Sequence, residues 1–295
     1  MKNKFVVSLA VVLLLFAVAP LASARQYGDT LRILAIGNSF SDDGMEHLPA
    51  LLEDLGIKNV ELARLYRGGC SLDRHLRYYE TDADVYRFWH SKAGENKWES
   101  EDKYTMDRAL KMGEWDIITL QQSSPKSGFY NTYWPYLDSL IAIIREYQPK
   151  ADLAWHLTWS YSSGSNHAEY FKYDHDMVKM YDFIRGAVRQ MLYDEEDTFE
   201  YVIPSGIAVQ IFRHTELNNA PLDLTRDGYH MDYGMGRYLL AITWYQSLIC
   251  SYTHKDVRNN KLRLELGNIP VNDETAPIAV GGARKAVKKW KRFLR

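Results

Sequence analysis

Three side chains with the chemistry of acyl transfer stand in two distant parts of the sequence. Ser39 follows a short apolar run, within Gly37-Asn38-Ser39-Phe40-Ser41, and Asp227 lies three residues before His230 in a Gly-containing stretch. A serine hydroxyl is a weak nucleophile until a base takes its proton, and a carboxylate can hold an imidazole in the tautomer that does so. The residues therefore predict a nucleophile, Ser39, a base, His230, and an orienting acid, Asp227, which only folding can bring together.

Hydrogen-bond donors follow two other apolar runs. Gly68 and Gly69 come after one of them, and Gln121 and Gln122 come directly after another. Taken singly, each feature has a structural explanation, because serine caps helices, a glycine pair makes a turn and a strand-end amide is often satisfied internally. Asp-x-x-His also arises by chance in many chains. Their placement at successive strand ends is what favours a common site, since ligands bind beyond the carboxyl ends of parallel strands.

The elements that must position these groups alternate between strands and helices. Apolar runs that predict buried strands occupy residues 31–36, 59–65, 116–120, 151–157 and 201–203. Helical patterns occupy residues 47–55, 134–147, 168–193 and 234–250. This alternation predicts an α/β protein, a three-layer α/β/α sandwich around a mostly five-stranded parallel sheet.

Two stretches do not fit the alternation. Residues 80–114 are polar and aromatic and are interpreted as an inserted loop or short-helix cap. Residues 283–295 carry seven basic side chains around a few apolar ones. Such a helix could lie on a membrane or an anionic polymer, but a terminal helix docked by its apolar stripe is the favoured interpretation.

The N-terminus has the pattern of a secretory signal peptide. Lys2 and Lys4 precede an apolar segment, residues 5–19, and Ala22-Ser23-Ala24 supplies a cleavage site. The apolar segment is shorter than the roughly 20 residues that span a bilayer. We expect residues 1–24 to be removed, leaving one domain, 25–295, with a core at about 30–250, an extension at 251–295 and no stable membrane insertion. An uncleaved anchor is the alternative, and export predicts a periplasmic or secreted protein without deciding between them.

Composition narrows the classes of function. The chain is 46% hydrophobic and 25% charged, as in ordinary globular proteins. Loss of Lys2 and Lys4 from 36 basic residues leaves 34 against 38 acidic ones, a net charge of −4. This mildly acidic balance argues against nucleic-acid binding. Cys70 and Cys250 are too few for a zinc site; the sequence leaves open whether they pair.

The residues around Ser39 and His230 resemble a known family. Residues 33–41, Ile-Leu-Ala-Ile-Gly-Asn-Ser-Phe-Ser, look like the first block of SGNH hydrolases (GDSL esterases and lipases), with Asn38 where Asp is usual. Residues 227–230 resemble the last block, Asp-x-x-His. The similarity runs from about residue 30 to 250, and is closest to a secreted branch described as a domain of unknown function.

The resemblance implies a flavodoxin-like fold that hydrolyses esters without metal or organic cofactor. In that family the oxyanion is held by the nucleophile N–H, a glycine and an asparagine side chain; here Ser39 and Gly69 (or Gly68) would supply the first two. No Gly-x-Asn-Asp follows the third strand of this chain. Gln121 is the expected replacement, ahead of Gln122, because an early strand-end residue has less freedom to swing away.

The resemblance also favours a carbohydrate esterase that removes acetyl groups from a polysaccharide. Aromatic residues near strand ends, Trp159 and Tyr161 among them, could face sugar rings, and Gln122 and His75 are further candidates for substrate contact. His156 lies within a strand pattern and is interpreted as a hydrogen-bonded structural residue. The oligomeric state is left open.

Two other functions remain open at this point. A lipase or thioesterase would act on longer acyl chains and would need an apolar acyl groove. A non-catalytic glycan-binding protein would keep the fold with an incomplete oxyanion hole, and the missing asparagine is its best support.

Overall fold

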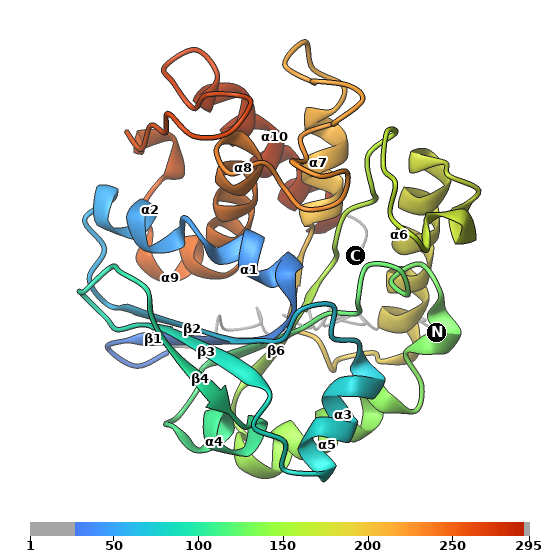
Figure 1. Ribbon diagram of the computed structural model, residues 1–295. Helices are drawn as coiled ribbons and strands as arrows, with labels where there is room; N and C mark the ends of the chain where they lie inside the picture. The colour runs from blue at the N-terminus through green and yellow to red at the C-terminus, as the bar shows by residue number, and fades with distance from the viewer. Residues whose placement is uncertain (1–26, 292–295) are drawn as a thin grey trace, which may run out of the picture.

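The computed structural model describes residues 27–291, and one seven-stranded sheet runs through them (Figure 1). The strand order is β4-β3-β2-β1-β5-β6-β7. The first two strands in this order are antiparallel additions at one edge, and the other five are parallel. The strands are β1 (Leu31–Gly37), β2 (Val60–Tyr66), β3 (Tyr86–Ser91), β4 (Glu99–Tyr104), β5 (Ile117–Leu120), β6 (Asp152–His156) and β7 (Tyr201–Ile203).

Helices cover both faces of this sheet, as Figure 1 shows. One face carries α1 (Ser39–Met45), α2 (Leu48–Asp54), α7 (Ser205–Phe212), α8 (Met235–Trp244), α9 (Cys250–Thr253) and α10 (Ala276–Lys291). The other carries α3 (Leu72–Glu80), α4 (Met106–Lys111), α5 (Tyr136–Tyr147) and α6 (Met177–Asp194). Single turns of 3-10 helix occupy Tyr130–Thr132, Tyr170–Tyr173 and Val257–Asn259, and a π-helical turn, Tyr245–Ile249, joins α8 to α9.

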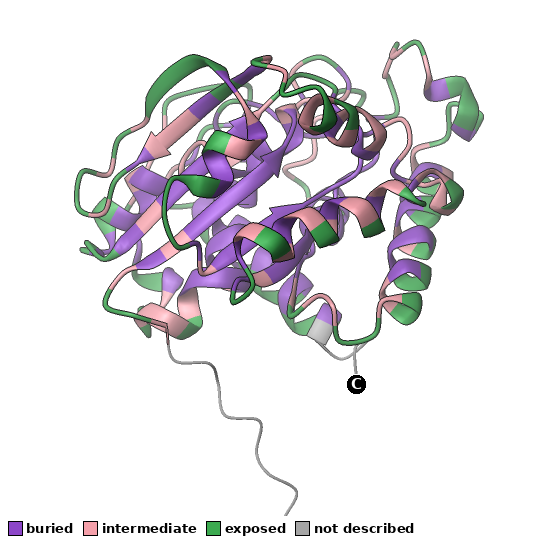
Figure 2. Ribbon diagram, turned by 90° about the horizontal axis from the view of Figure 1, so that it is seen from below, coloured by how far each residue is buried: buried purple, intermediate pink, exposed green. Residues whose placement is uncertain are grey.

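The central strands are apolar because neither of their faces meets water. All four residues of β5 are buried, as are four of the five in β6. In Figure 2 the buried colour fills the sheet, while the outer sides of the helices are exposed. Parallel strands covered on both faces have continuous apolar runs rather than alternating ones, which is why the sequence pattern located them.

The chain changes direction across the sheet between β1 and β5. From β1 it crosses to β2 on one side, and after the β3–β4 hairpin it returns to β5 on the other side of β1. Gly37 pairs with Tyr66, and Ala35 pairs with Thr119. Gln121, two residues beyond Thr119, therefore comes level with Gly37. The loops after β1, β2 and β5 meet at this switch point, where doubly wound sheets bind ligands.

The predicted three-layer α/β/α architecture is confirmed, including five parallel strands. Two helix predictions were too long, however. The helix expected at 168–193 begins only at Met177, where Asp176 accepts hydrogen bonds from the N–H groups of Val178 and Lys179. The helix expected at 234–250 changes to a π turn at Tyr245. Helices α1, α3 and α7 had not been predicted.

The interpretation of residues 80–114 as a loop or short-helix cap was wrong. They form the β3–β4 hairpin followed by α4, and β3 extends the sheet by pairing antiparallel with β2. Five of the six residues in β4, Glu-Ser-Glu-Asp-Lys-Tyr, are exposed and only Tyr104 is buried. A polar edge strand carries no apolar signal, so its strand character comes from its pairing with β3.

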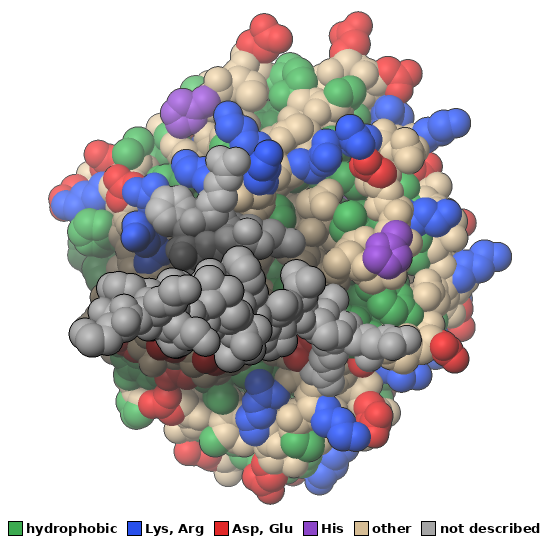
Figure 3. Space-filling view, turned by 180° about the vertical axis from the view of Figure 1, so that it is seen from behind, with side chains coloured by type: hydrophobic (Ala, Val, Ile, Leu, Met, Phe, Trp, Pro, Cys, Tyr) green, Lys and Arg blue, Asp and Glu red, His purple; other side chains and the backbone are tan. Residues whose placement is uncertain are grey.

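The C-terminal helix is docked on the protein. Ala283, Ala286, Val287 and Trp290 of α10 are buried, and the helix packs against α7 and α8. Its basic side chains from residue 284 to 289 are exposed, as the favoured interpretation predicted. On the opposite face of the molecule from that in Figure 1, acidic and basic side chains are interspersed in the visible part (Figure 3). The predicted signal peptide, residues 1–24, lies outside the described residues.

Both cysteines are free thiols. Cys70 is buried and Cys250 is partly buried. Burial raises the pKa of the Cys70 thiol to about 12. Cys70 therefore behaves as a small apolar side chain.

Candidate active site

Ser39 is the first residue of a helix that starts directly after β1. Asn38 caps α1, and its Oδ1 accepts a hydrogen bond from the N–H of Phe40 at 3.0 Å. The first N–H groups of a helix have no partner within the helix. The cap uses that of Phe40, which leaves the N–H of Ser39 beside its own hydroxyl for a ligand.

The segment with Asp227 and His230 is a tight, irregular loop closed by backbone contacts. Thr225 and Met231 form an isolated antiparallel bridge, and the N–H of Arg226 donates to the carbonyl of His230 at 2.9 Å. Gly228 has φ +94°, and a side chain there would lie 2.9 Å from the Cα of Ser165. A glycine is therefore required at the middle of this loop, both for its conformation and for its close approach to Ser165.

The structure brings the three predicted residues together. The Nε2 atom of His230 lies 2.9 Å from the Oγ atom of Ser39, and its Nδ1 atom lies 2.7 Å from Oδ2 of Asp227. Oδ1 of Asp227 accepts the backbone N–H of His230 at 2.8 Å. Although partial burial acts to raise it, these hydrogen bonds hold the pKa of Asp227 below its usual value. An ionised Asp227 keeps the proton of the imidazole on Nδ1 and leaves Nε2 as the acceptor for the Ser39 hydroxyl.

Gly69 lies in the loop after β2, and the side-chain amide of Asn38 donates to the carbonyl of the next residue, Cys70, at 2.9 Å. The φ of Gly69 is +59°, and a Cβ atom there would meet nothing within 4 Å. Arg74 donates to the Gly69 carbonyl at 3.2 Å and thereby orients the peptide. Among the hydrogen bonds of the described residues, none uses the N–H of Gly69. The exposed loop thus presents a backbone donor with open space around it.

Gln121 belongs to a buried chain of neutral hydrogen bonds that begins at Asn38. Its Nε2 donates to Oδ1 of Asn38 at 2.7 Å, and its Oε1 lies 2.7 Å from Nδ1 of His156. Nε2 of His156 lies 2.9 Å from the hydroxyl of Ser205. Burial lowers the pKa of His156 to about 3, so the ring is neutral and donates from Nδ1 to Gln121. His156 is the hydrogen-bonded structural residue that its strand position had indicated.

Asp43 was not predicted to take part in the site. Its side chain is 1% exposed and lies 2.8–3.0 Å from the guanidinium groups of Arg226 and Arg237. Its Oδ2 also accepts the N–H of Met231 at 2.9 Å. A single carboxylate in α1 therefore fixes the loop of His230 relative to the helix of Ser39. The only signal was that one arginine directly precedes Asp227 and another lies in the first turn of α8, which is too common a pattern to interpret.

Four predicted substrate contacts are fully buried, and a polar atom of each bonds a neighbouring residue of the protein. The side-chain amide of Gln122 bonds the N–H of Leu72 and the carbonyl of Thr132. All four are buried by packing against residues that could not be identified as neighbours from the sequence. The residues concerned are Gln122, His75, Trp159 and Tyr161.

Of these four, Trp159 contributes to the site from beneath, whereas His75 lies apart from it. Trp159 stacks on Phe40 at 4.1 Å and donates from its indole N–H to the carbonyl of Tyr229 at 2.8 Å. It supports both sides of the Ser39–His230 contact. His75 instead packs against Tyr86, and burial lowers its pKa to about 3.

Partly exposed rings lie closer to the candidate base. The rings of Tyr229 and His230 are 4.3 Å apart, and His167 packs edge-on against Tyr229 at 4.9 Å. Both Tyr229 and His167 are partly accessible, unlike Tyr161 behind them. They were not predicted, because His167 belongs to a loop whose course depends on the tertiary structure.

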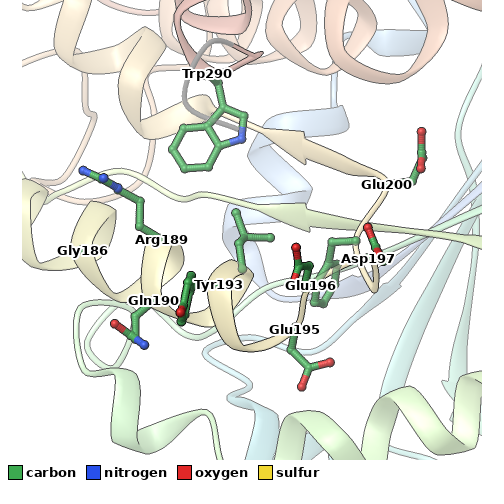
Figure 4. A pocket seen from close by; sticks show the side chains of 11 residues that line it. Gly186, Arg189, Gln190, Tyr193, Glu195, Glu196, Asp197, Glu200 and Trp290 are labelled. Carbon is green, nitrogen blue, oxygen red and sulfur yellow. The ribbon is translucent and has the colours of Figure 1, made fainter. Parts of the chain in front are cut away.

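A separate cavity of about 820 Å³ lies away from these residues (Figure 4). It is formed by the second half of α6, the segment 195–200 before β7, and Trp290. The start of β7 is at the amino ends of the parallel strands, opposite the edge that carries Ser39. The cavity is therefore not part of the candidate site.

Two further properties concern the described part of the chain. Within residues 27–291, no three His, Cys, Asp or Glu side chains gather in a way that could hold a metal ion. Across the same residues, none of the helices combines the length and the apolar character needed to cross a bilayer.

Fold and site together define a parallel α/β protein whose switch point holds a hydrogen-bonded serine, histidine and aspartate. Residues 32–285 match the model of DUF4886, a domain of unknown function, and the chain belongs to that family. A DUF4886 family protein from Bacteroides uniformis is 34% identical, with a TM-score of 0.79 over 88% of this chain and 95% of that one. No curated protein matches the chain.

More distant likenesses exist among solved structures. The acetylxylan esterase Axe2 from Geobacillus stearothermophilus, a catalytic mutant, is 11% identical with a TM-score of 0.49, over 75% of this chain and 95% of that one. A protein from Slackia heliotrinireducens, provisionally described as an SGNH hydrolase, is 22% identical with a TM-score of 0.48, over 74% and 98%. Likenesses of this extent carry no weight for function.

Proposed function

We propose that this protein is an exported serine esterase that uses Ser39, His230 and Asp227. The observation that carries the proposal is the continuous hydrogen-bonded contact from Oγ of Ser39 through His230 to Asp227, at 2.9 and 2.7 Å. A serine with no catalytic task has no need of an imidazole that is itself oriented by a carboxylate. Export rests on the pattern of residues 1–24.

The reaction would begin with proton transfer from Ser39 to Nε2 of His230. The freed oxygen attacks the ester carbonyl, and a bond forms between Oγ of Ser39 and the acyl carbon. His230 then gives its proton to the departing alcohol, which leaves an acyl-enzyme. Water, deprotonated by His230, releases the acid and restores Ser39. Asp227 stabilises the charged imidazole in both halves of the reaction.

The negative oxygen that forms during each attack needs hydrogen-bond donors. The N–H groups of Ser39 and Gly69 are the first two in this proposal, supported by the helix start and the open Gly69 peptide. Gln121 is the third. One of its amide protons bonds Asn38, next to the nucleophile, and the second is the one proposed to face the oxyanion. Loss of one such donor typically lowers kcat about 10²–10³-fold.

The substrate class proposed is an acylated carbohydrate, most simply an acetyl ester. The half-buried rings of Tyr229 and His167 beside His230 support this, since aromatic faces pack well against sugar rings. The nearest competing function is hydrolysis of longer acyl esters.

The first test is hydrolysis of 4-nitrophenyl acetate by the mature chain and by Ser39→Ala and His230→Ala. We expect both changes to lower kcat/KM at least ~10³-fold, because each removes a member of a unit that acts together. Ser139→Ala and His214→Ala are matched controls, since Ser139 is partly exposed, His214 is exposed, and the side chain of each bonds a carbonyl of its own segment.

Equal, slow rates in all five proteins would sink the esterase proposal and favour a non-catalytic glycan-binding protein. A comparison of acetyl with octanoyl esters determines which length of acyl chain the protein prefers. A clear preference for octanoyl would replace the deacetylase with a lipase or thioesterase.

A further inference from the structure

The β3–β4 hairpin extends the edge of the sheet that carries the candidate site. Arg87, near the start of β3, pairs with Tyr66 at the carboxyl end of β2, and Tyr104 at the end of β4 pairs with Tyr86. Because both pairings are antiparallel, the open end of the hairpin comes to the same edge as the loop with Gly68 and Gly69.

A cavity of about 540 Å³ occupies this position. It is lined by residues 66–68 at the end of β2, residues 84–87 at the start of β3 and residues 102–103 at the end of β4. Gly68 is thus shared between the cavity wall and the loop whose next residue, Gly69, presents its N–H to the site. The backbone N–H of Arg67 in the cavity wall donates to the carbonyl of Gly37, two residues before Ser39, at 3.2 Å, so the cavity adjoins the strand end that carries Ser39.

Two basic side chains without carboxylate partners, Arg67 and Lys103, line this cavity. Arg87 is neutralised by Asp102, 2.6 Å away. Arg67 and Lys103 form no ion pair with any described residue, and Arg67 contacts only the carbonyl of Val85 with its guanidinium. Asp84 is the one lining carboxylate left to balance them.

A further arginine lies at the rim of the same loop. Arg74 contacts the carbonyl of Gly69 and the hydroxyl of Tyr78, whose ring packs edge-on against Tyr86 in the cavity wall. The chain as a whole has more acidic than basic residues. The concentration of positive charge next to Gly69, the proposed oxyanion donor, is therefore a local property.

We propose that this cavity binds the anionic group of an acidic sugar, a carboxylate or a sulfate, that belongs to the ester substrate. The proposal rests on the esterase function and narrows its substrate class. Guanidinium groups bind carboxylate and sulfate oxygens in pairs, and Arg67 and Lys103 would neutralise a charge that otherwise opposes the oxyanion formed beside Gly69. The substrate class is therefore an acylated acidic glycan rather than a neutral one.

The test compares three sugars with one acetyl group at the same ring position: methyl glucoside, methyl glucuronide and methyl glucoside 6-sulfate. We expect kcat/KM to be at least about tenfold higher for an anionic sugar than for the neutral one, mainly through KM. The two anionic sugars distinguish a carboxylate from a sulfate. The preference should shrink as sodium chloride is raised, because the groups are exposed and screened by salt.

Arg67→Gln should lower the anionic-to-neutral ratio of kcat/KM about tenfold. Arg185→Gln is the matched control, since it removes the same charge from an exposed pair on α6 and should leave the ratio at the wild-type value. A ratio near one in the wild type, or a ratio that Arg67→Gln does not change, would overturn the subsite while leaving the esterase function intact.

Binding to the Ser39→Ala variant tests the subsite without turnover. Calorimetry should show tighter binding of methyl glucuronide or methyl glucoside 6-sulfate than of methyl glucoside, and Arg67→Gln in the same background should remove the difference. If no ester is hydrolysed at all, the esterase proposal fails, and this measurement still decides whether the cavity binds anionic sugars.

Discussion

The two halves of the candidate site are held by networks of opposite kinds. Behind Ser39, neutral groups connect Asn38, Gln121, His156 and Ser205, all at most 2% exposed. Behind His230, the connection is ionic, from Asp43 to two arginines. The neutral chain fixes which atom donates at each step. The ionic one binds a loop with little regular structure to a helix.

This difference predicts how each half of the candidate site responds when one of its polar groups is removed. A neutral chain loses individual hydrogen bonds, whereas an ionic network that loses its one carboxylate leaves two cations facing each other. The strand-to-helix turn of Ser39 is also held by β1, while the loop of His230 depends on Asp43 and on Trp159. We therefore expect the ionic half to be the more sensitive.

The largest effect is expected for Asp43→Asn. Removal of one partner from a buried ion pair typically costs about 3–5 kcal/mol of unfolding free energy, and Asp43 is 1% exposed. Displacement of the His230 loop should also lower kcat with less effect on KM, measured where the variant is folded. Unfolding in urea gives the stability and ester hydrolysis gives the kinetics.

Asp182→Asn is the matched control for this change. Asp182 also pairs with an arginine, Arg185, but its side chain is 53% exposed, and exposed pairs contribute about 0–1 kcal/mol. If Asp43→Asn were no more destabilising than Asp182→Asn, the ionic network would not be what holds the His230 loop.

A smaller effect is expected from His156→Phe in the neutral half. The ring is kept, but Oε1 of Gln121 and the Ser205 hydroxyl lose their partner in a buried place, at a cost of about 1–3 kcal/mol for each group left unsatisfied. Gln121 would also be free to turn away from Asn38, which should reduce kcat. His214→Phe, at an exposed histidine, provides the control and should change stability by less than about 1 kcal/mol. Unchanged stability and kcat in His156→Phe would show that the neutral chain does not support Ser39.

The smallest effect is expected in mild acid. There the free energy of unfolding should decrease with each pH unit. Burial lowers the pKa values of His75 and His156 to about 3, whereas histidine in the unfolded chain titrates near 6.5. The unfolded state therefore takes up protons that the folded state does not. The stabilisation is complete above about pH 6.5 and is lost as the pH falls towards 3, by at most about 1.4 kcal/mol per pH unit for each histidine.

Urea midpoints measured at pH 7.5, 6 and 5 should therefore decrease in that order. His156→Phe should lose the part of the slope that one histidine contributes, and His214→Phe should keep the wild-type slope. Equal midpoints across this range would contradict the burial of two neutral histidines.

The amino-acid sequence by itself determined the class of fold, and it pointed to the three residues that the structure brings together at the candidate site. Apolar runs of strand length are local signals, and residues directly after such runs fall at the same edge of a parallel sheet. Asp227 and His230 are close enough in sequence to contact each other through one glycine-containing loop. For these features, short-range periodicity and turn chemistry were sufficient.

Tertiary structure decided which polar and aromatic groups are accessible at the candidate site. Trp159, His75 and Gln122 have residue types suited to binding, but the packing around them buries all three. Asp43 became important only because folding brought it to two arginines about 190 residues later in the chain, at separations of 183 and 194. The polar strand β4 and the cavity beside it likewise arise from pairing with a neighbour. Burial and long-range pairing depend on what packs against a residue, and that information is distributed over the whole chain.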